Sequence, residues 1–148
     1  MSAHNPQFLI GVGSAGADLS LTSTADIYTF TIPCKMKPLR VGITVGTTIS
    51  SSSAPVVKFD RRPAAGSDTS RGDGDVGTVT LSTTVAQGQV YYEDNDGGTS
   101  WTTTLLDEGD QVVVQVTTAA SSTGGGVPWI MYEQIPEVAG NNSNMNAG

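Results

Sequence analysis

The sequence is poor in charged side chains and in residues that favour helices. Asp, Glu, Lys and Arg together make up 14% of the 148 residues, so the charged coat of a typical soluble monomer is thin. Fifteen serines and nineteen threonines fill the polar positions instead. Threonine and valine suit a pleated, half-buried surface. Together with 18 glycines and 7 prolines, this composition predicts an all-β fold with many turns.

Basic residues are missing from the second half of the chain. All seven lysines and arginines lie at or before Arg71, where the net charge is +3, whereas the remainder carries ten acidic residues and a net charge of −10. Either strands from the two halves interleave and the charges mix, or the surface is dipolar and orients the protein on a partner. The total of −7 argues against a nucleic-acid partner, which requires a basic surface.

Histidine and cysteine, the usual catalytic and zinc-binding residues, occur once each, as His4 and Cys34. A serine or cysteine nucleophile would need His4 as its base, and a zinc site needs more ligands than these two. We therefore expect no enzyme, no metal and no cofactor, and Cys34 is interpreted as a small buried hydrophobe. A carboxylate pair for glycoside hydrolysis could still come from residues of the predicted turns: Glu93, Asp94, Asp107, Glu108 and Asp110.

Long apolar runs are absent as well. No stretch approaches the ~20 apolar residues of a membrane helix. The N-terminal residues MSAHNPQFLIGVG lack the basic segment and the long apolar run of a signal peptide. We therefore expect no membrane partner and synthesis in a cytoplasm.

What the sequence does contain is a series of short apolar, β-branched segments separated by turn residues. Eight of them are predicted as strands: 26–32, 39–46, 55–60, 79–82, 89–94, 101–106, 111–118 and 127–135. None has the 3.6-residue period of a helix. The pattern predicts an eight-stranded antiparallel β-sandwich of jelly-roll type. Residues 1–25 are predicted as an extended N-terminal arm with a short strand, residues 26–136 as the sandwich domain, and residues 137–148 as a flexible tail.

Two acidic, glycine-rich loops resemble known binding motifs. SRGDGD (70–75) contains the adhesion tripeptide Arg71-Gly72-Asp73, and DNDGG (94–98) begins like a calcium loop, with Asp94 and Asp96 as weak candidate ligands. Both have the composition that any tight turn selects. We interpret SRGDGD as a turn and keep calcium as an alternative for the second loop.

The last predicted strand is apolar on both faces. In VPWIMYEQIP (127–136) Trp129 and Met131 alternate with Ile130 and Tyr132, and such a strand is expected to be covered on both sides. A neighbouring protein is expected to cover one face, with Phe8, Leu9 and Ile10 of the arm anchored in a neighbour's groove. A carbohydrate-binding sandwich, using stacking side chains, is the alternative: Trp101, Tyr91 and Tyr92.

The second half of the chain resembles jelly-roll capsid decoration (cement) proteins of tailed phages. The likeness is carried by GDGDVGTVTLS (72–82), QGQVYYED (87–94), LLDEGDQVVVQVTTAASSTGGG (105–126) and VPWIMYEQIPE (127–137). The resemblance implies a homotrimer on the outside of a virion, bound to the major capsid protein and bridging neighbouring capsomers. It implies no catalytic residue.

Overall fold

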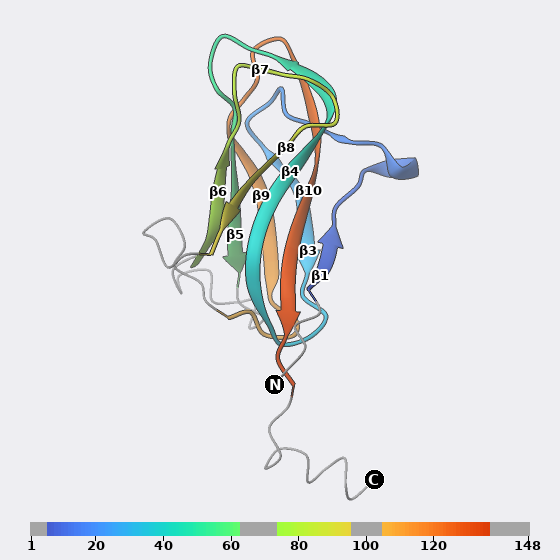
Figure 1. The fold of residues 1–148 in the computed structure, drawn as a ribbon, viewed down its shortest axis with the longest axis vertical. Helices are drawn as coiled ribbons and strands as arrows, with labels where there is room; N and C mark the ends of the chain where they lie inside the picture. The colour runs from blue at the N-terminus through green and yellow to red at the C-terminus, as the bar shows by residue number, and fades with distance from the viewer. Residues whose placement is uncertain (1–5, 63–73, 96–104, 137–148) are drawn as a thin grey trace, which may run out of the picture.

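The chain forms two antiparallel β-sheets packed face to face in a computed structural model, which describes residues 6–62, 74–95 and 105–136 (Figure 1). These residues contain ten strands: β1 (Gln7–Ile10), β2 (Leu19–Ser20), β3 (Asp26–Thr31), β4 (Met36–Ser50), β5 (Val56–Arg62), β6 (Gly74–Thr80), β7 (Thr84–Val85), β8 (Val90–Asp94), β9 (Gln111–Thr118) and β10 (Thr123–Gln134). One short 3-10 turn, η1 (Ser14–Gly16), lies between β1 and β2. The predicted all-β sandwich is confirmed.

Sheet A has the order β1-β10-β4-β7, with β2 also paired to β10 and β8 also paired to β4. Sheet B has the order β3-β9-β5-β6. The chain therefore passes repeatedly from one sheet to the other, and the two longest strands, β4 and β10, lie side by side in the middle of sheet A (Figure 1). No helix long and apolar enough to cross a membrane occurs in the described parts of the chain.

Alternating side chains build the core between the sheets. Val41, Ile43 and Val45 of β4 are fully or almost fully buried, because side chains alternate along a strand and these three point to the inner face. Sheet B contributes Phe59 and the valines of β9 at positions 112, 114 and 116. Val113 lies outside this core cluster, as the predicted alternation along 111–118 requires.

Several strands extend beyond their predicted bounds, because glycine-rich segments pair into the sheets. Gly124, Gly125 and Gly126, predicted as part of a flexible loop, are buried at the start of β10. A Cβ added to Gly126 would lie 2.5 Å from the Cγ2 of Ile43. These glycines therefore serve close packing, one of the two usual roles of glycine within a strand.

The DEGD segment forms the predicted tight turn. The backbone N–H of Asp110 donates to the carbonyl of Asp107 at 3.0 Å, and Gly109 has a φ of 88°. The Asp110 carboxylate, 2% exposed, accepts from the Asp107 N–H at 3.0 Å and from the Arg61 Nε at 3.2 Å. The turn thus ties the start of β9 to the end of β5.

The expectation of an extended N-terminal arm needs correction for residues 7–25. Strand β1 pairs with β10 in continuous register from Gln7↔Tyr132 to Ile10↔Trp129, and Leu21 is fully buried in the core. The expectation assigned Phe8, Leu9 and Ile10 to a neighbour's groove, whereas they pair with β10 of the same chain. Burial of apolar residues of this segment, such as Leu9 and Leu21, offsets the cost of ordering a short strand. Residues 137–148 and the predicted strand at 101–104 lie outside the described residues.

Deleting residues 2–12 should therefore destabilise the domain. The deletion removes β1 together with the Gly11 N–H bond to the Pro128 carbonyl, and we expect a loss of about 2–3 kcal/mol and a fall in melting temperature of about 5–10 °C. Thermal unfolding followed by circular dichroism measures the change. A control truncation of residues 2–5 keeps β1, and equal melting temperatures for both truncations would contradict the assignment of β1 to the folded domain.

Candidate functional site

The residues first considered for catalysis or metal binding do not assemble in the described part of the chain. No group of three or more His, Cys, Asp or Glu side chains suited to a metal ion occurs within residues 6–62, 74–95 and 105–136. Cys34 is half-buried beside the core, and desolvation, aided by the Glu108 charge, raises the pKa of its thiol. A raised pKa disfavours the reactive thiolate, so the local environment does not activate Cys34 as a nucleophile.

The calcium candidate Asp94 is engaged by a cation. Its carboxylate accepts from the Nε of Arg40 at 2.5 Å, and this hydrogen bond raises the pKa of the guanidinium further. The same guanidinium lies 3.9 Å from the centre of the Tyr92 ring.

The other candidates in these loops lie outside the described residues: Asp96, Trp101 and the Arg71-Gly72-Asp73 tripeptide. The last two residues of SRGDGD, Gly74 and Asp75, begin strand β6.

The two tyrosines proposed for sugar stacking occupy different environments. Tyr91 packs against the core and donates its hydroxyl to the Ser82 Oγ at 3.0 Å. Tyr92 is 51% exposed on the opposite face of β8, where the Arg40 guanidinium already covers one face of its ring. Of these two tyrosines, only Tyr92 is exposed, and the Arg40 guanidinium lies against its ring.

The feature that stands out is an apolar area on the outer face of sheet A, to which three strands contribute. Strand β1 contributes Phe8 and Ile10, β10 contributes Val127 and Trp129, and β8 contributes Val90. Phe8, Ile10 and Val90 are 53%, 59% and 48% exposed. We call these five residues, with Thr44 of β4, the apolar face. An exposed patch of large apolar side chains marks an interaction site more often than scattered single residues do.

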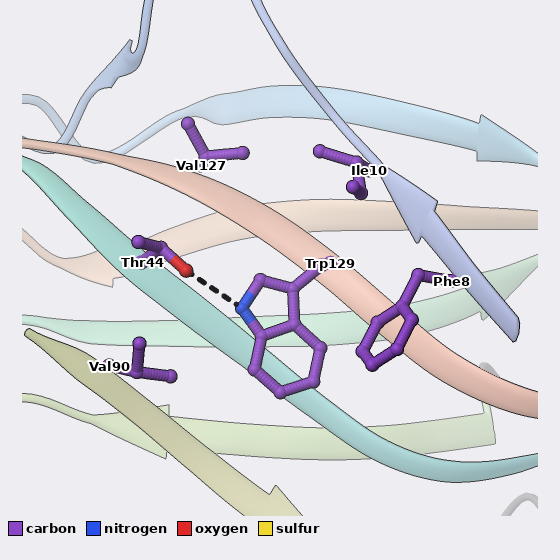
Figure 2. Close-up of a pocket in the computed structure, with 6 residues that line it drawn as sticks. All are labelled: Phe8, Ile10, Thr44, Val90, Val127 and Trp129. Carbon is purple, nitrogen blue, oxygen red and sulfur yellow. Dashed lines mark hydrogen bonds between the residues drawn. The ribbon is translucent and has the colours of Figure 1, made fainter. Parts of the chain in front are cut away.

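Trp129 is the centre of the apolar face (Figure 2). Its indole ring crosses β4 over Gly42, the residue opposite it in register, and a Cβ on Gly42 would clash with the ring. The indole Nε1 donates to the Thr44 Oγ1 at 3.1 Å. The Phe8 ring meets the indole edge to face, with centroids 5.7 Å apart and an interplanar angle of 65°. Trp129 is consequently held in one orientation by contacts on several sides.

A shallow groove runs along this face. Its volume is about 400 Å³, and its lining consists of Phe8, Ile10, Thr44, Val90, Val127 and Trp129. Thr44 supplies the polar atom, and its oxygen already accepts the indole hydrogen bond. The groove therefore offers few hydrogen-bonding groups to a ligand and is suited to apolar side chains.

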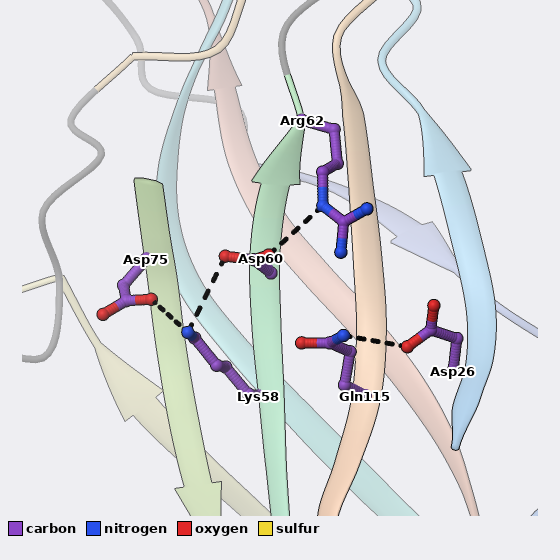
Figure 3. Close-up of polar contacts among 6 residues, drawn as sticks. All are labelled: Asp26, Lys58, Asp60, Arg62, Asp75 and Gln115. Carbon is purple, nitrogen blue, oxygen red and sulfur yellow. Dashed lines mark hydrogen bonds and ion pairs between the residues drawn. The ribbon is translucent and has the colours of Figure 1, made fainter. Parts of the chain in front are cut away.

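The outer face of sheet B has the opposite character (Figure 3). Lys58 of β5 lies between two carboxylates, with its Nζ 3.0 Å from Asp75 and 3.8 Å from Asp60. The Arg62 Nε donates to Asp60 at 3.3 Å, and the Gln115 Nε2 donates to Asp26 at 2.9 Å. The outer face of sheet B thus carries several paired charges, whereas the outer face of sheet A has an apolar area with one ion pair, Arg40–Asp94, beside it.

Ion pairs across the domain join the basic first half of the sequence to the acidic second half. Arg40–Asp94, Lys58–Asp75 and Arg61–Asp110 each connect one half to the other. Interleaving of β4 and β5 with β6, β8 and β9 produces this mixing. Of the two interpretations of the charge asymmetry, the described residues favour mixing over a dipolar surface.

Comparisons with protein-family models, curated proteins and solved structures found no match. The candidate site consequently depends on the geometry of this chain alone.

Three of the five residues predicted to contact another protein lie together. Phe8, Ile10 and Trp129 line the groove, Met131 is half-buried next along β10, and Leu9 points inward and packs on the core. Sequence reasoning missed Gly42, Thr44 and Val90. The glycine within the 39–46 strand was an available signal, because glycine inside a strand often marks the close approach of a bulky group.

Replacing Gly42 by alanine should displace the indole of Trp129. The added methyl group has no room beneath the ring, so we expect a loss of about 1–3 kcal/mol in the free energy of unfolding. In a Trp129→Ala background the same replacement should cost less than about 0.5 kcal/mol, because the clash is gone. Urea unfolding of the four proteins measures the coupling, and equal costs in both backgrounds would show that Trp129 does not rest on Gly42.

Proposed function

We propose that this chain is a non-enzymatic structural protein of a virion, which binds the outside of an assembled capsid and stabilises it by bridging neighbouring capsomers. The observation that carries the proposal is the apolar face of sheet A, with three large side chains about half exposed. Such a face is stable in water only at a cost of roughly 25 cal/mol for each Å² of apolar surface that stays wet. Covering it with protein removes that cost.

A protein partner accounts for this surface better than a small polar ligand. The groove lining is aliphatic and aromatic, and the Thr44 oxygen is already used by the Trp129 indole. A sugar needs several polar side chains for its hydroxyl groups as well as an aromatic platform. Apolar side chains of another protein need only complementary shape and exclusion of water.

The strand order supports the jelly-roll part of the proposal. We interpret β1 and β2 as one interrupted strand along β10, and β7 and β8 as another along β4, because each pair lies on the same side of its partner. Counted this way, the described strands make two four-stranded sheets in which the chain crosses repeatedly between layers, as jelly rolls do. The chain would then be an eight-stranded jelly roll of the kind that the resemblance implies.

The remaining parts of the proposal follow from the resemblance. The partner is the major capsid protein, the location is the virion surface, and the oligomer is a homotrimer. Low charge content, at 14% of residues, is consistent with a protein that has much of its surface covered by other subunits.

Co-sedimentation with empty capsids of the phage that encodes the chain tests the proposal. We expect the purified protein to pellet with the capsids up to a fixed stoichiometry and to raise the temperature at which the capsids dissociate. Lysozyme, an unrelated protein of similar size, serves as the control for non-specific pelleting with the capsids. Protein that stays in the supernatant at micromolar capsid-subunit concentrations would refute the proposed function.

A further inference from the structure

We propose that the apolar face of sheet A is the surface by which copies of this chain associate with each other. This inference rests on the proposed function, which includes a homo-oligomer, and it names the surface through which that oligomer forms. The protein that covers the apolar face is then a neighbouring copy, and the oligomer formed in this way is the unit that binds the capsid.

The composition of the face favours a permanent interface between like chains. Interfaces that form and dissociate are about as polar as the remaining protein surface, whereas homo-oligomer interfaces are more apolar and depleted of charge at their centre. Five of the six residues lining the groove are apolar, and none is charged. The nearest described ion pair, Arg40–Asp94, lies at one end of β8 and is neutral as a pair.

Charge repulsion also limits which surfaces two copies can share. Each chain has a net charge of −7, so association is least opposed where a surface carries no net charge. Sheet B exposes Lys58, Arg62 and Asp75 in part on its outer face (Figure 3), and burying these charged groups would require their desolvation. The apolar face requires no such desolvation.

The edge next to the apolar face lacks the features that usually prevent strand association. Strand β1, with the sequence QFLI, contains no charged residue and no proline and pairs with β10 without a bulge. Among the other outer strands of the described sheets, β3 carries Asp26, β6 carries Asp75, and β8 carries Glu93 and Asp94, whereas the two-residue strands β2 and β7 carry no charge. Natural proteins use charges and bulges to block unwanted pairing at sheet edges, so the uncharged β1 edge is consistent with a neighbour that covers it.

The exposed area is of the right order for the centre of such an interface. Phe8, Ile10 and Val90 of the apolar face, with the adjoining Tyr92, are each about half exposed. This corresponds to roughly 300–500 Å² of surface if each large side chain contributes about 150–250 Å² when fully exposed. A stable interface buries about 800 Å² on each partner, with an apolar centre and a polar rim. The face therefore supplies the centre, and the adjoining polar residues of β4, β8 and β10 supply the rim.

Sedimentation of the full-length chain and two matched variants tests the inference. Ile10→Lys and Val90→Lys place one positive charge on either side of the groove, at side chains that are 59% and 48% exposed. Thr29→Lys is the control, because Thr29 is exposed on β3 beside Val113, on the outer face of sheet B. Circular dichroism and the melting temperature verify that each variant folds.

We expect the wild-type chain and Thr29→Lys to sediment at micromolar concentration as a multiple of the 15.2 kDa chain. Ile10→Lys and Val90→Lys should each weaken association at least about tenfold, the size of effect that a charge at the centre of an interface produces. A monomeric wild-type chain, or folded variants that associate as tightly as wild type, would overturn the inference. Capsid co-sedimentation of the wild type is scored separately. An oligomer that ignores capsids refutes capsid binding but not this inference, and a monomer that binds capsids refutes this inference and the proposed homotrimer but not capsid binding.

Discussion

The pairing of β4 with β10 is the interaction on which the other features depend. It is the longest pairing in the described chain, from Thr123↔Ser50 to Gln134↔Met36, and it forms the middle of sheet A. Its inner face supplies Val41, Ile43 and Ile130 to the core, and its outer face supplies Thr44, Val127 and Trp129 to the groove. Because side chains alternate along both strands, a one-residue slip in register would exchange these two sets and destroy the core and the outer surface together.

Small residues make this pairing compatible with the large ones. Gly42 leaves room for the Trp129 indole, and Gly125 and Gly46 leave room for the Asp18 carboxylate, which accepts from the Thr47 hydroxyl at 2.7 Å. Proline has no backbone N–H to donate, yet Pro128 lies in a central strand. Its carbonyl accepts from the Gly11 N–H, and the N–H that it lacks would point to the same side, between β1 and β2, where no strand pairs with it. The N-terminal segment is thereby joined to β10 at several points.

Sequence patterns predicted the all-β class, the strand at 111–118 and the tight turn at 107–110, because each depends on local alternation or turn chemistry. They also singled out Phe8, Ile10 and Trp129, which the structure brings together along one groove, since apolar residues without an obvious core position are conspicuous in so polar a chain. They did not predict that β1 pairs with β10, because four residues do not specify a partner 120 positions away. Gly42, Thr44 and Val90 escaped prediction for the same reason: their role depends on register between strands, which one strand's sequence does not specify.

The two outer faces of the sandwich differ in polarity, so they suit different surroundings. Sheet B has paired charges suited to water, and sheet A has a rigidly held tryptophan surrounded by half-exposed apolar residues. The central claim is that protein covers this second surface. Hydroxyl-radical footprinting of Phe8 and Tyr92 over a range of chain concentrations tests it most directly. The account predicts that oxidation of both residues falls as the concentration rises and copies associate, whereas oxidation that is high and independent of concentration would contradict it.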